Sequence, residues 1–253
     1  MTPVFQEYSR FYDLIYSEKD YENESAFVMN LLRECQPNIK TLLDLGCGTG
    51  RHNSYLLKQG LEVWGIDQSK TMLEVAKHKY PEIKNNFISG DVTEVRLGKK
   101  FDAVISLFHV LSYQITDDSV LRFFQTVESH LEDDGVAAID FWYGPGVLHL
   151  KPEKREKIFT NKDFEVNRLS TPTELRNKNI VEIELELNIF NKNNQERSRT
   201  IENHRMRYFF SDDIERMLVQ TKLRLVETKE WLSRKELNPE SWSAYVLLQK
   251  GHR

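Results

Sequence analysis

The chain has 253 residues, of which 40% are hydrophobic and 29% charged, a composition typical of a globular protein with one substantial core. Its net charge of −4 gives no general attraction for nucleic acid or for an anionic membrane, and no apolar run is long enough to span a bilayer. The two cysteines exclude a disulfide framework, and the N-terminus does not resemble a secretory signal. We therefore expect a cytoplasmic protein.

Two helices are predicted before the first strand, at 5–16 and 21–35, because apolar residues recur there every three or four positions. From residue 41 onward, buried strands alternate with helices, which favours a mostly parallel sheet covered on both faces. Ser69 is expected to cap the helix that begins after it. The strands are expected at 41–45, 61–66, 86–89, 101–108 and 136–142, and the helices between them at 51–59, 70–80 and 117–132.

The alternation of strands and helices stops after Gly144. Residues 158–208 are predicted to be antiparallel strands without a helix between them, and 181–189 alternate strictly between apolar and acidic residues. A helix capped by Ser211 should follow. The last two strands, near 223–232 and 242–250, are close enough in sequence to pair antiparallel at the edge of the sheet.

A glycine-rich segment, LLDLGCGTG at 42–50, follows the first predicted strand and precedes a helix. Glycines permit a tight turn and a close approach of a ligand to the backbone, and the helix N-terminus offers free N–H groups to an anionic or carboxylate-bearing cofactor. A dinucleotide loop requires a third glycine where this chain has Arg51 or Asn53. We therefore expect a cofactor with an amino-acid tail rather than NAD.

Acidic residues end the next two strands. Asp67 closes VWGID and is a candidate acceptor for both ribose hydroxyls of an adenosine group, although it can also simply cap the next helix. Asp91, in GDV, can accept a hydrogen bond from an adenine amino group. Both acids are expected at the same edge of the sheet as the glycine loop.

Together these segments closely resemble the class I S-adenosylmethionine-dependent methyltransferases. The resemblance covers about residues 40–142 and implies a doubly wound, mostly parallel seven-stranded α/β sheet, with an antiparallel β insertion and an antiparallel C-terminal edge strand. It implies S-adenosyl-L-methionine as the cofactor. The residues that match the family's cofactor positions, or neighbour them, are Tyr16, Asp44, Gly46, Cys47, Gly48, Gly50, Asp67, Gln68, Asp91, Val92, Leu107 and Phe108.

A narrower resemblance involves YDLIY at 12–16, KDY at 19–21 and SLFHVLSY at 106–113. These segments are similar to those of N-methyltransferases that act on nucleotide-linked deoxysugars. The resemblance implies an N-terminal tyrosine near the cofactor and a β insertion on the substrate side. It predicts a core formed by 1–143 and 209–253 with an N-terminal helical lid, and an insertion at 144–208. Tyr21 is the second tyrosine of the pattern and is expected on the substrate side.

Candidate catalytic residues are Tyr16 and His109. The ring or hydroxyl of Tyr16 can contact a methyl-bearing sulfonium, or the residue can belong to a core-facing aromatic stripe. His109 follows the fourth strand and has a side chain suited to general-base chemistry, although a lone histidine is more often part of the packing. Tyr113 and Trp142 are expected to line the acceptor pocket, and core packing is an equal alternative for Trp142.

The segment HRMRYFF at 204–210 alternates like a strand, with His204 on one face and Arg205 on the other. One interpretation gives His204 to the substrate and Arg205 to a phosphate. The other interpretation pairs Arg197 and Arg199 with glutamates of the neighbouring strand and is favoured for those two arginines. The role of Arg205 stays open.

We predict methyl transfer to a small molecule, first the amino group of a nucleotide-linked sugar, and otherwise another amine or a hydroxyl. A homodimer is a possible assembly, and neither a metal cluster nor a nucleic-acid or membrane partner is expected. The alternatives from other classes are an NAD(P)-dependent oxidoreductase and a non-catalytic cofactor-binding protein.

Overall fold

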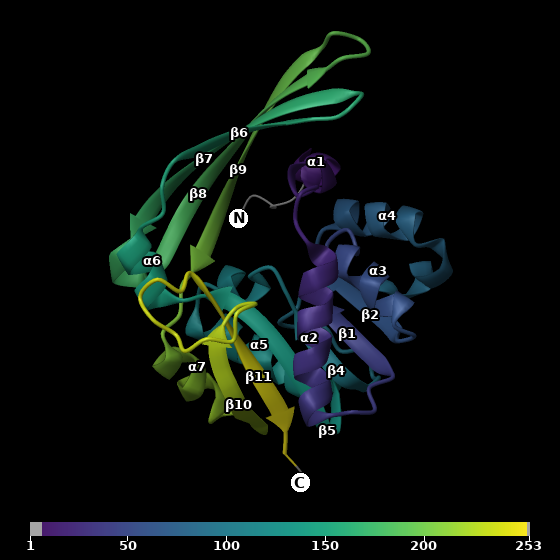
Figure 1. Cartoon of the computed structure of the whole chain (residues 1–253), viewed down its shortest axis with the longest axis vertical. Coiled ribbons are helices and arrows are strands. Elements are labelled where there is room, and N and C mark those ends of the chain that lie inside the picture. Colours follow the sequence, from purple (N-terminus) through teal and green to yellow (C-terminus); the bar gives the residue numbers. More distant parts are fainter. Residues whose placement is uncertain (1–6, 252–253) are drawn as a thin grey trace.

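The computed structural model describes residues 7–251 and contains two β-sheets (Figure 1). The first has seven strands in the order β10-β11-β5-β4-β1-β2-β3. Its first five strands in the chain are parallel to one another, and β11 runs antiparallel to both of its neighbours. The strands are β1 Thr41–Leu45, β2 Glu62–Asp67, β3 Phe87–Ser89, β4 Phe101–Ser106, β5 Leu131–Trp142, β10 Leu223–Glu230 and β11 Ser243–Lys250.

Helices cover both faces of this sheet, because successive residues of a buried strand point to opposite sides. Leu42 packs with α2 and α3 on one face, whereas Leu43 packs with α5 and α7 on the other. The predicted doubly wound fold is therefore confirmed. The helices are α1 Glu7–Ile15, α2 Tyr21–Cys35, α3 Arg51–Lys58, α4 Lys70–Lys79, α5 Asp117–His130, α6 Gly144–Leu150 and α7 Ser211–Leu218.

One detail of the C-terminal pair differs from the prediction. β10 and β11 do pair antiparallel, but β11 lies between β10 and β5, so β10 forms the edge. The insertion of β11 buries its apolar residues on both sides, since Ala244 and Val246 join the cluster on one face and Tyr245 and Leu247 the cluster on the other. A strand this apolar on both faces is more stable inside the sheet than at its edge.

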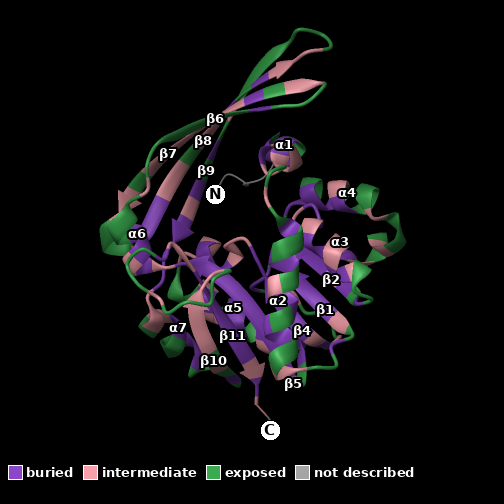
Figure 2. Ribbon diagram, viewed as in Figure 1, coloured by how far each residue is buried: buried purple, intermediate pink, exposed green. Residues whose placement is uncertain are grey.

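The second sheet is antiparallel and has the order β6-β7-β8-β9. Its strands are β6 Arg155–Thr160, β7 Phe164–Leu175, β8 Ile180–Asn191 and β9 Arg197–Arg207. The antiparallel strands expected within 158–208 are therefore present, and α6 precedes them at the start of the insertion predicted over 144–208. The far end of this sheet extends beyond the rest of the chain, and much of it is exposed (Figure 2).

Helix α1 packs against the inner face of the second sheet. Its residues Tyr8, Phe11 and Ile15 share an apolar cluster with Val166 of β7 and Leu187 of β8. These contacts explain the aromatic stripe that the sequence shows before residue 16. Phe5, the first member of that stripe, lies outside the described residues.

The start of α7 is fixed differently from the prediction. Phe210, not Ser211, is the N-cap, and its backbone N–H donates to the Asp213 carboxylate at 3.0 Å. Ser69 does cap α4 as expected, because its hydroxyl accepts a hydrogen bond from Met72 N. Among the helices of residues 7–251, none is long and apolar enough to cross a membrane.

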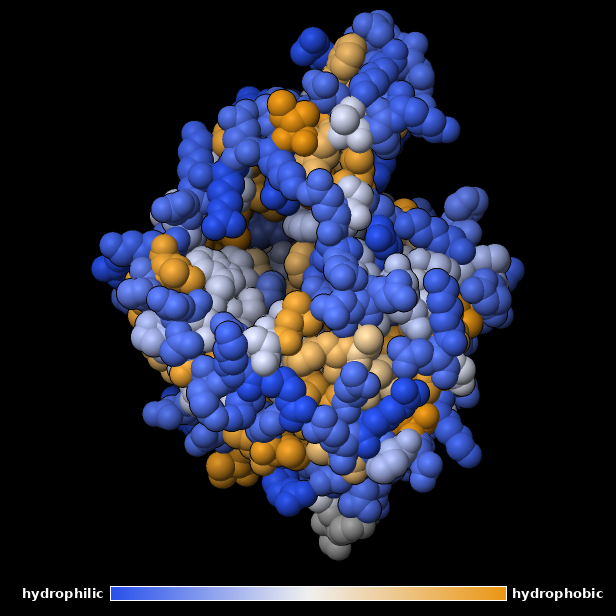
Figure 3. All heavy atoms as spheres, in the orientation of Figure 1, coloured by the Kyte–Doolittle hydropathy of each residue, from blue (hydrophilic) through white to orange (hydrophobic). Residues whose placement is uncertain are grey.

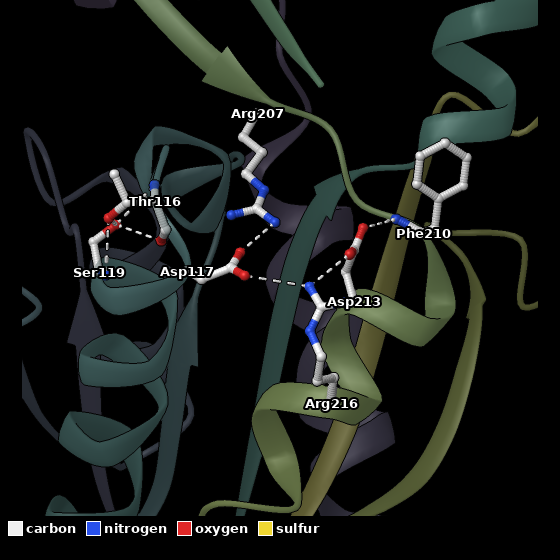
Figure 4. A network of polar contacts seen from close by, with 7 residues as sticks. All are labelled: Thr116, Asp117, Ser119, Arg207, Phe210, Asp213 and Arg216. Carbon is white, nitrogen blue, oxygen red and sulfur yellow. Dashed lines mark hydrogen bonds and ion pairs between the residues drawn. The ribbon is translucent and has the colours of Figure 1, made fainter. Parts of the chain in front are cut away.

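A network of charges joins the end of β9 to the first sheet's helices (Figure 4). Arg207 is 7% exposed and its Nη2 lies 2.7 Å from Oδ1 of Asp117, at the start of α5. Arg216 of α7 is mostly exposed and contacts both Asp117 and Asp213. Asp117 therefore accepts from one buried and one exposed guanidinium.

We expect Asp117→Asn to destabilise the protein by about 1–3 kcal/mol, because it leaves a buried guanidinium without its carboxylate. Arg216→Ala removes only exposed ion pairs and should change the free energy of unfolding by less than about 1 kcal/mol. Urea unfolding of both variants measures the difference. Equal destabilisation by the two substitutions would show that burial of Arg207 is unimportant.

Candidate active site

The turn between β1 and α3 has a backbone that only glycine adopts easily. Gly46, Gly48 and Gly50 have φ values of 90°, 54° and 74°. A Cβ atom on Gly46 would lie 2.4 Å from Cγ2 of Val110. The N–H groups of Gly46 and Cys47 both donate to the carbonyl of Ile66, which fixes the turn to the end of β2.

Asp67 ends β2 and holds the same turn through its side chain. Its Oδ2 accepts from Gly48 N at 2.9 Å, and its Oδ1 accepts from Ser69 N at 2.8 Å. Burial raises the pKa of this carboxyl, and the two backbone hydrogen bonds oppose that rise. The cap of α4 is Ser69, so Asp67 is not there merely as a helix cap.

Asp44, near the end of β1, is 2% exposed, and its Oδ2 has no hydrogen-bond partner among the described residues. Burial, followed by the charge of Asp67, raises its pKa to about 8. A buried carboxyl without a cation nearby favours its neutral form. A cationic ligand group beside Asp44 would reverse this preference.

A cavity of about 1970 Å³ lies between the carboxyl edge of the parallel strands and the inner face of the second sheet. Figure 3 shows part of it as a hollow between the second sheet and the N-terminal helices. Most of the predicted site residues line it, namely Tyr16, Gly46, Gly48, Asp67, Gln68, Asp91, Val92, Leu107, Phe108, His109, Tyr113, Trp142, His204 and Arg205.

Four predicted residues do not line this cavity. Asp44 and Gly50 line neither this cavity nor a second one of only about 30 Å³, which Cys47 and Tyr21 do line. Tyr21 is 3% exposed and the Arg51 guanidinium lies 4.4 Å from its ring centroid. The structure thus groups Tyr21 with the glycine turn, not with the substrate-side residues where the sequence pattern places it.

His109 is held by a buried carboxylate. Its backbone N–H donates to Asp140 Oδ1 at 2.8 Å, and its Nδ1 lies 3.1 Å from Oδ2 of the same residue. Asp140 belongs to β5 and is 1% exposed; it fixes the His109 backbone through this hydrogen bond, whereas the contact with Nδ1 is close without meeting hydrogen-bond geometry. The predicted strand 101–108 ends earlier, at Ser106, because Phe108 and His109 both have positive φ values and leave the sheet.

Tyr16 directly follows α1 and lines the cavity. Its hydroxyl is 3.0 Å from the Tyr8 hydroxyl, and its ring meets the Phe108 ring edge-on at 4.9 Å. Tyr16 is therefore both part of the aromatic stripe and a lining residue of the cavity.

Tyr113 and His204 form a pair that connects the two sheets. The Tyr113 hydroxyl lies 2.8 Å from His204 Nδ1, and His204 Nε2 lies 3.4 Å from Glu202 Oε2. Burial raises the pKa of Tyr113 well above its usual value. Tyr113 and His204 therefore contact each other as well as lining the cavity.

The arginines of β9 differ from one another. Arg199 pairs with Glu186 at 2.7 Å, as expected, but Arg197 lies over the Phe190 ring and pairs with none of the three glutamates. Arg205 lines the cavity, and its Nε is 2.9 Å from Glu182 Oε1. Its charge is therefore already balanced, which weakens the interpretation of Arg205 as the phosphate ligand.

Sequence reasoning missed several residues of the site. Asp140 had a detectable signal, because it is the single acid within the apolar run VAAIDFW at 136–142. Asp13 lies in the YDLIY segment and accepts from Thr49 Oγ1 at 2.8 Å, which ties α1 to the glycine turn. Arg155 and Arg168 line the cavity from β6 and β7, and nothing in their sequence surroundings distinguishes them from other surface arginines.

This fold, with a glycine turn after β1 and an acid at the end of β2, defines the class I methyltransferase architecture. Residues 42–135 match the family described as a methyltransferase domain. The resemblance seen in the sequence is confirmed: the chain contains a methyltransferase domain within a class I methyltransferase fold. Among residues 7–251, no cluster of three or more potential metal ligands occurs.

The chain is 34% identical over 136 residues to the dTDP-3-amino-3,4,6-trideoxy-alpha-D-glucopyranose N,N-dimethyltransferase of Streptomyces venezuelae, a match that covers 53% of this chain and 56% of the relative. The chain spans little more than half the length of the first curated relatives that it matches.

Solved structures share the fold over almost the whole chain. The Streptomyces venezuelae protein DesVI has a TM-score of 0.81 at 24% identity, with 96% of this chain and 98% of that chain covered. The SAM-bound amino pentose methyltransferase CalS10 of Micromonospora echinaspora has a TM-score of 0.75 at 20% identity, with 99% of each chain covered.

The raised pKa of Asp44 predicts a pH effect on stability. Between pH 5 and pH 7 the folded protein keeps the Asp44 proton while the unfolded chain has lost it, so stability should fall as pH rises toward about 8. The contribution of one such group is at most about 1.4 kcal/mol per pH unit. Asp44→Asn should therefore flatten the pH dependence of the unfolding free energy in ligand-free protein, measured by urea titration. An unchanged slope would contradict the assigned pKa.

Proposed function

We propose that the protein transfers a methyl group from S-adenosyl-L-methionine to the amino group of a nucleotide-linked sugar. The observation that carries this proposal is the cavity, where the glycine turn and Asp67 face the same space as Tyr16 and His109. The names of the curated relatives support the acceptor class, since the first three are dimethyltransferases of dTDP-linked amino sugars.

The residues of the turn fit the proposed methyl donor. Asp44 has an unpartnered buried oxygen near which the donor's ammonium group would be stabilised. A Cβ at Gly48 would meet no atom within 4 Å, so a ligand has room beside this backbone. Each Asp67 oxygen accepts one backbone N–H and has a second lone pair for a ribose hydroxyl. Asp91 and Val92 are proposed to lie near the adenine.

The donor, when bound, supplies an activated methyl group, so the protein must mainly align a neutral amine and remove its proton. Nδ1 of His109 lies 3.1 Å from Asp140 Oδ2, so we propose that the second ring nitrogen, Nε2, faces the acceptor. A neutral imidazole can accept the amine proton there. Tyr16, whose hydroxyl is fixed by Tyr8, is proposed to contact the methyl-bearing cation.

The same arrangement of His109 and Asp140 also suits a hydroxyl acceptor, which needs a base more than an amine does. An amine stays the first choice because of the relatives' names. The NAD(P) alternative is disfavoured, since Arg51 and Asn53 stand where a dinucleotide loop requires glycine.

Two measurements on the purified chain test the proposal. Calorimetry should show binding of S-adenosylhomocysteine and no binding of NAD, and mass spectrometry should detect methylated product from dTDP-linked amino sugars supplied with S-adenosylmethionine. Binding of NAD without S-adenosylhomocysteine would overturn the class of cofactor. Binding of the cofactor without turnover of any amine or hydroxyl acceptor would support a non-catalytic role instead.

His109→Asn should lower kcat/KM for the amino sugar by roughly 10- to 100-fold at pH 7, since the variant cannot accept the amine proton. The loss should shrink as pH rises, because the free amine then deprotonates without help. A pH profile of initial rates measures both effects. His78→Asn, on the exposed side of α4, is the matched control and should keep normal rates. A loss that is constant with pH would assign His109 to packing.

A further inference from the structure

Two arginines and a serine lie together on the cavity side of the second sheet. Arg155 of β6 is directly opposite Ser170 of β7 in the antiparallel register, and Arg168 is the next residue of β7 on the same face. That face points inward, because Val166 two residues earlier is buried against α1. Arg155, Arg168 and Ser170 all line the large cavity.

Neither arginine has a carboxylate partner among the ion pairs of the described residues, and Arg155 is exposed whereas Arg168 is half-buried. Arg205 pairs with Glu182, and Lys157, which is opposite Arg168 in the register, pairs with Glu18. Within residues 7–251, neither Arg155 nor Arg168 forms an ion pair, and the Nε of Arg168 is buried without a hydrogen bond. The remaining acids of the lining, such as Glu7 and Glu153, are exposed to solvent.

Packing holds the Arg168 guanidinium over the cavity. It lies 5.8 Å from the Tyr16 ring centroid and 5.3 Å from that of Phe159. Its neighbour Tyr8 does not neutralise it, because burial raises the pKa of Tyr8 well above its usual value despite the opposing effect of Arg168. Arg168 also hydrogen-bonds with the Tyr8 side chain. It is thus a preorganised positive charge, partly removed from water, whose Nε donor is unused.

We propose that Arg155, Arg168 and Ser170 form a phosphate-binding subsite for the acceptor. This inference rests on the proposed function and deepens it: the subsite would hold the diphosphate of the nucleotide, while Tyr16 and His109 face the amine in the same cavity. Guanidinium groups match phosphate oxygens with paired, charge-assisted hydrogen bonds, and the serine hydroxyl adds one more donor. The subsite takes the phosphate role that the sequence left open for Arg205.

The alternative is that Arg168 serves only to pack against Tyr16 and Phe159. The two roles differ in what substitution does to charged and uncharged acceptors. A packing residue should affect both acceptors equally, whereas a phosphate ligand should affect only the nucleotide-linked one. Arg155 contacts neither ring, so its substitution tests the subsite without disturbing that packing.

The experiment uses Arg168→Gln, Arg155→Gln and the double variant of the full chain. Steady-state kinetics are measured with a dTDP-linked amino sugar and with the methyl glycoside of the same sugar, which has no phosphate. We expect KM for the dTDP-linked acceptor to rise about 10- to 100-fold in each single variant, while KM for the glycoside stays unchanged. Arg168→Lys should recover part of the loss. Arg197→Gln, at the far end of the same sheet, is the matched control.

A second experiment measures ligand binding, so that the phosphate subsite is tested independently of methyl transfer. Inorganic pyrophosphate and dTDP are titrated into each variant in the presence of S-adenosylhomocysteine, with malonate as a carboxylate probe. Weaker binding of the two phosphate ligands in the variants supports the subsite, even if the wild type methylates neither sugar and the proposed function fails. Unaltered phosphate binding, equal effects on both acceptors, or a loss confined to malonate would overturn the subsite while leaving methyl transfer intact.

Discussion

The turn after β1 is the constraint on which the rest of the site depends. Gly46 has no room for a Cβ because Val110 packs against it, and the N–H of Gly48 is held by Asp67. The turn therefore fixes the end of β2 and the segment after β4 relative to each other. Since His109 directly precedes Val110, the same packing also sets the position of the imidazole. A substitution at Gly46 would displace both halves of the cavity at once.

Helix α1 connects this turn to the second sheet. On one side Asp13 accepts from Thr49 and pairs with Arg51 and Lys79, and on the other side Phe11 and Ile15 pack against β6–β8. The cavity is thus closed by a helix that contacts both of its walls. Tyr16 lies at the end of that helix, so its place over the cavity depends on contacts from residues far apart in the sequence.

The sequence predicts those features that local pattern determines. Period-two and helical repeats located β1, β2, α2 and α5 within a few residues, and the glycine spacing identified the turn and Asp67. The left-handed backbone at Phe108 and His109 was not predicted, because positive φ values do not change the pattern of apolar residues. The predicted fourth strand was therefore too long. Arg168 and Arg155 were not predicted as site residues for another reason. Their proximity depends on the register between β6 and β7, and the lack of a partner acid is visible only in three dimensions.

The charges that face the cavity are divided between its two walls. The carboxylates of Asp67 and Asp91 lie at the ends of the parallel strands, whereas Arg155 and Arg168 extend from the opposite sheet. Under the proposed function, the acidic wall faces a sulfonium donor and the basic wall faces a phosphorylated acceptor. Each ligand is then attracted to the wall of opposite charge, and the cationic donor is repelled by the arginines. This arrangement favours simultaneous binding of the two ligands, each at its own place in the cavity. Under the proposed function, Arg155 and Arg168 form the basic half of this arrangement, whereas the charge of Arg205 is already paired with Glu182.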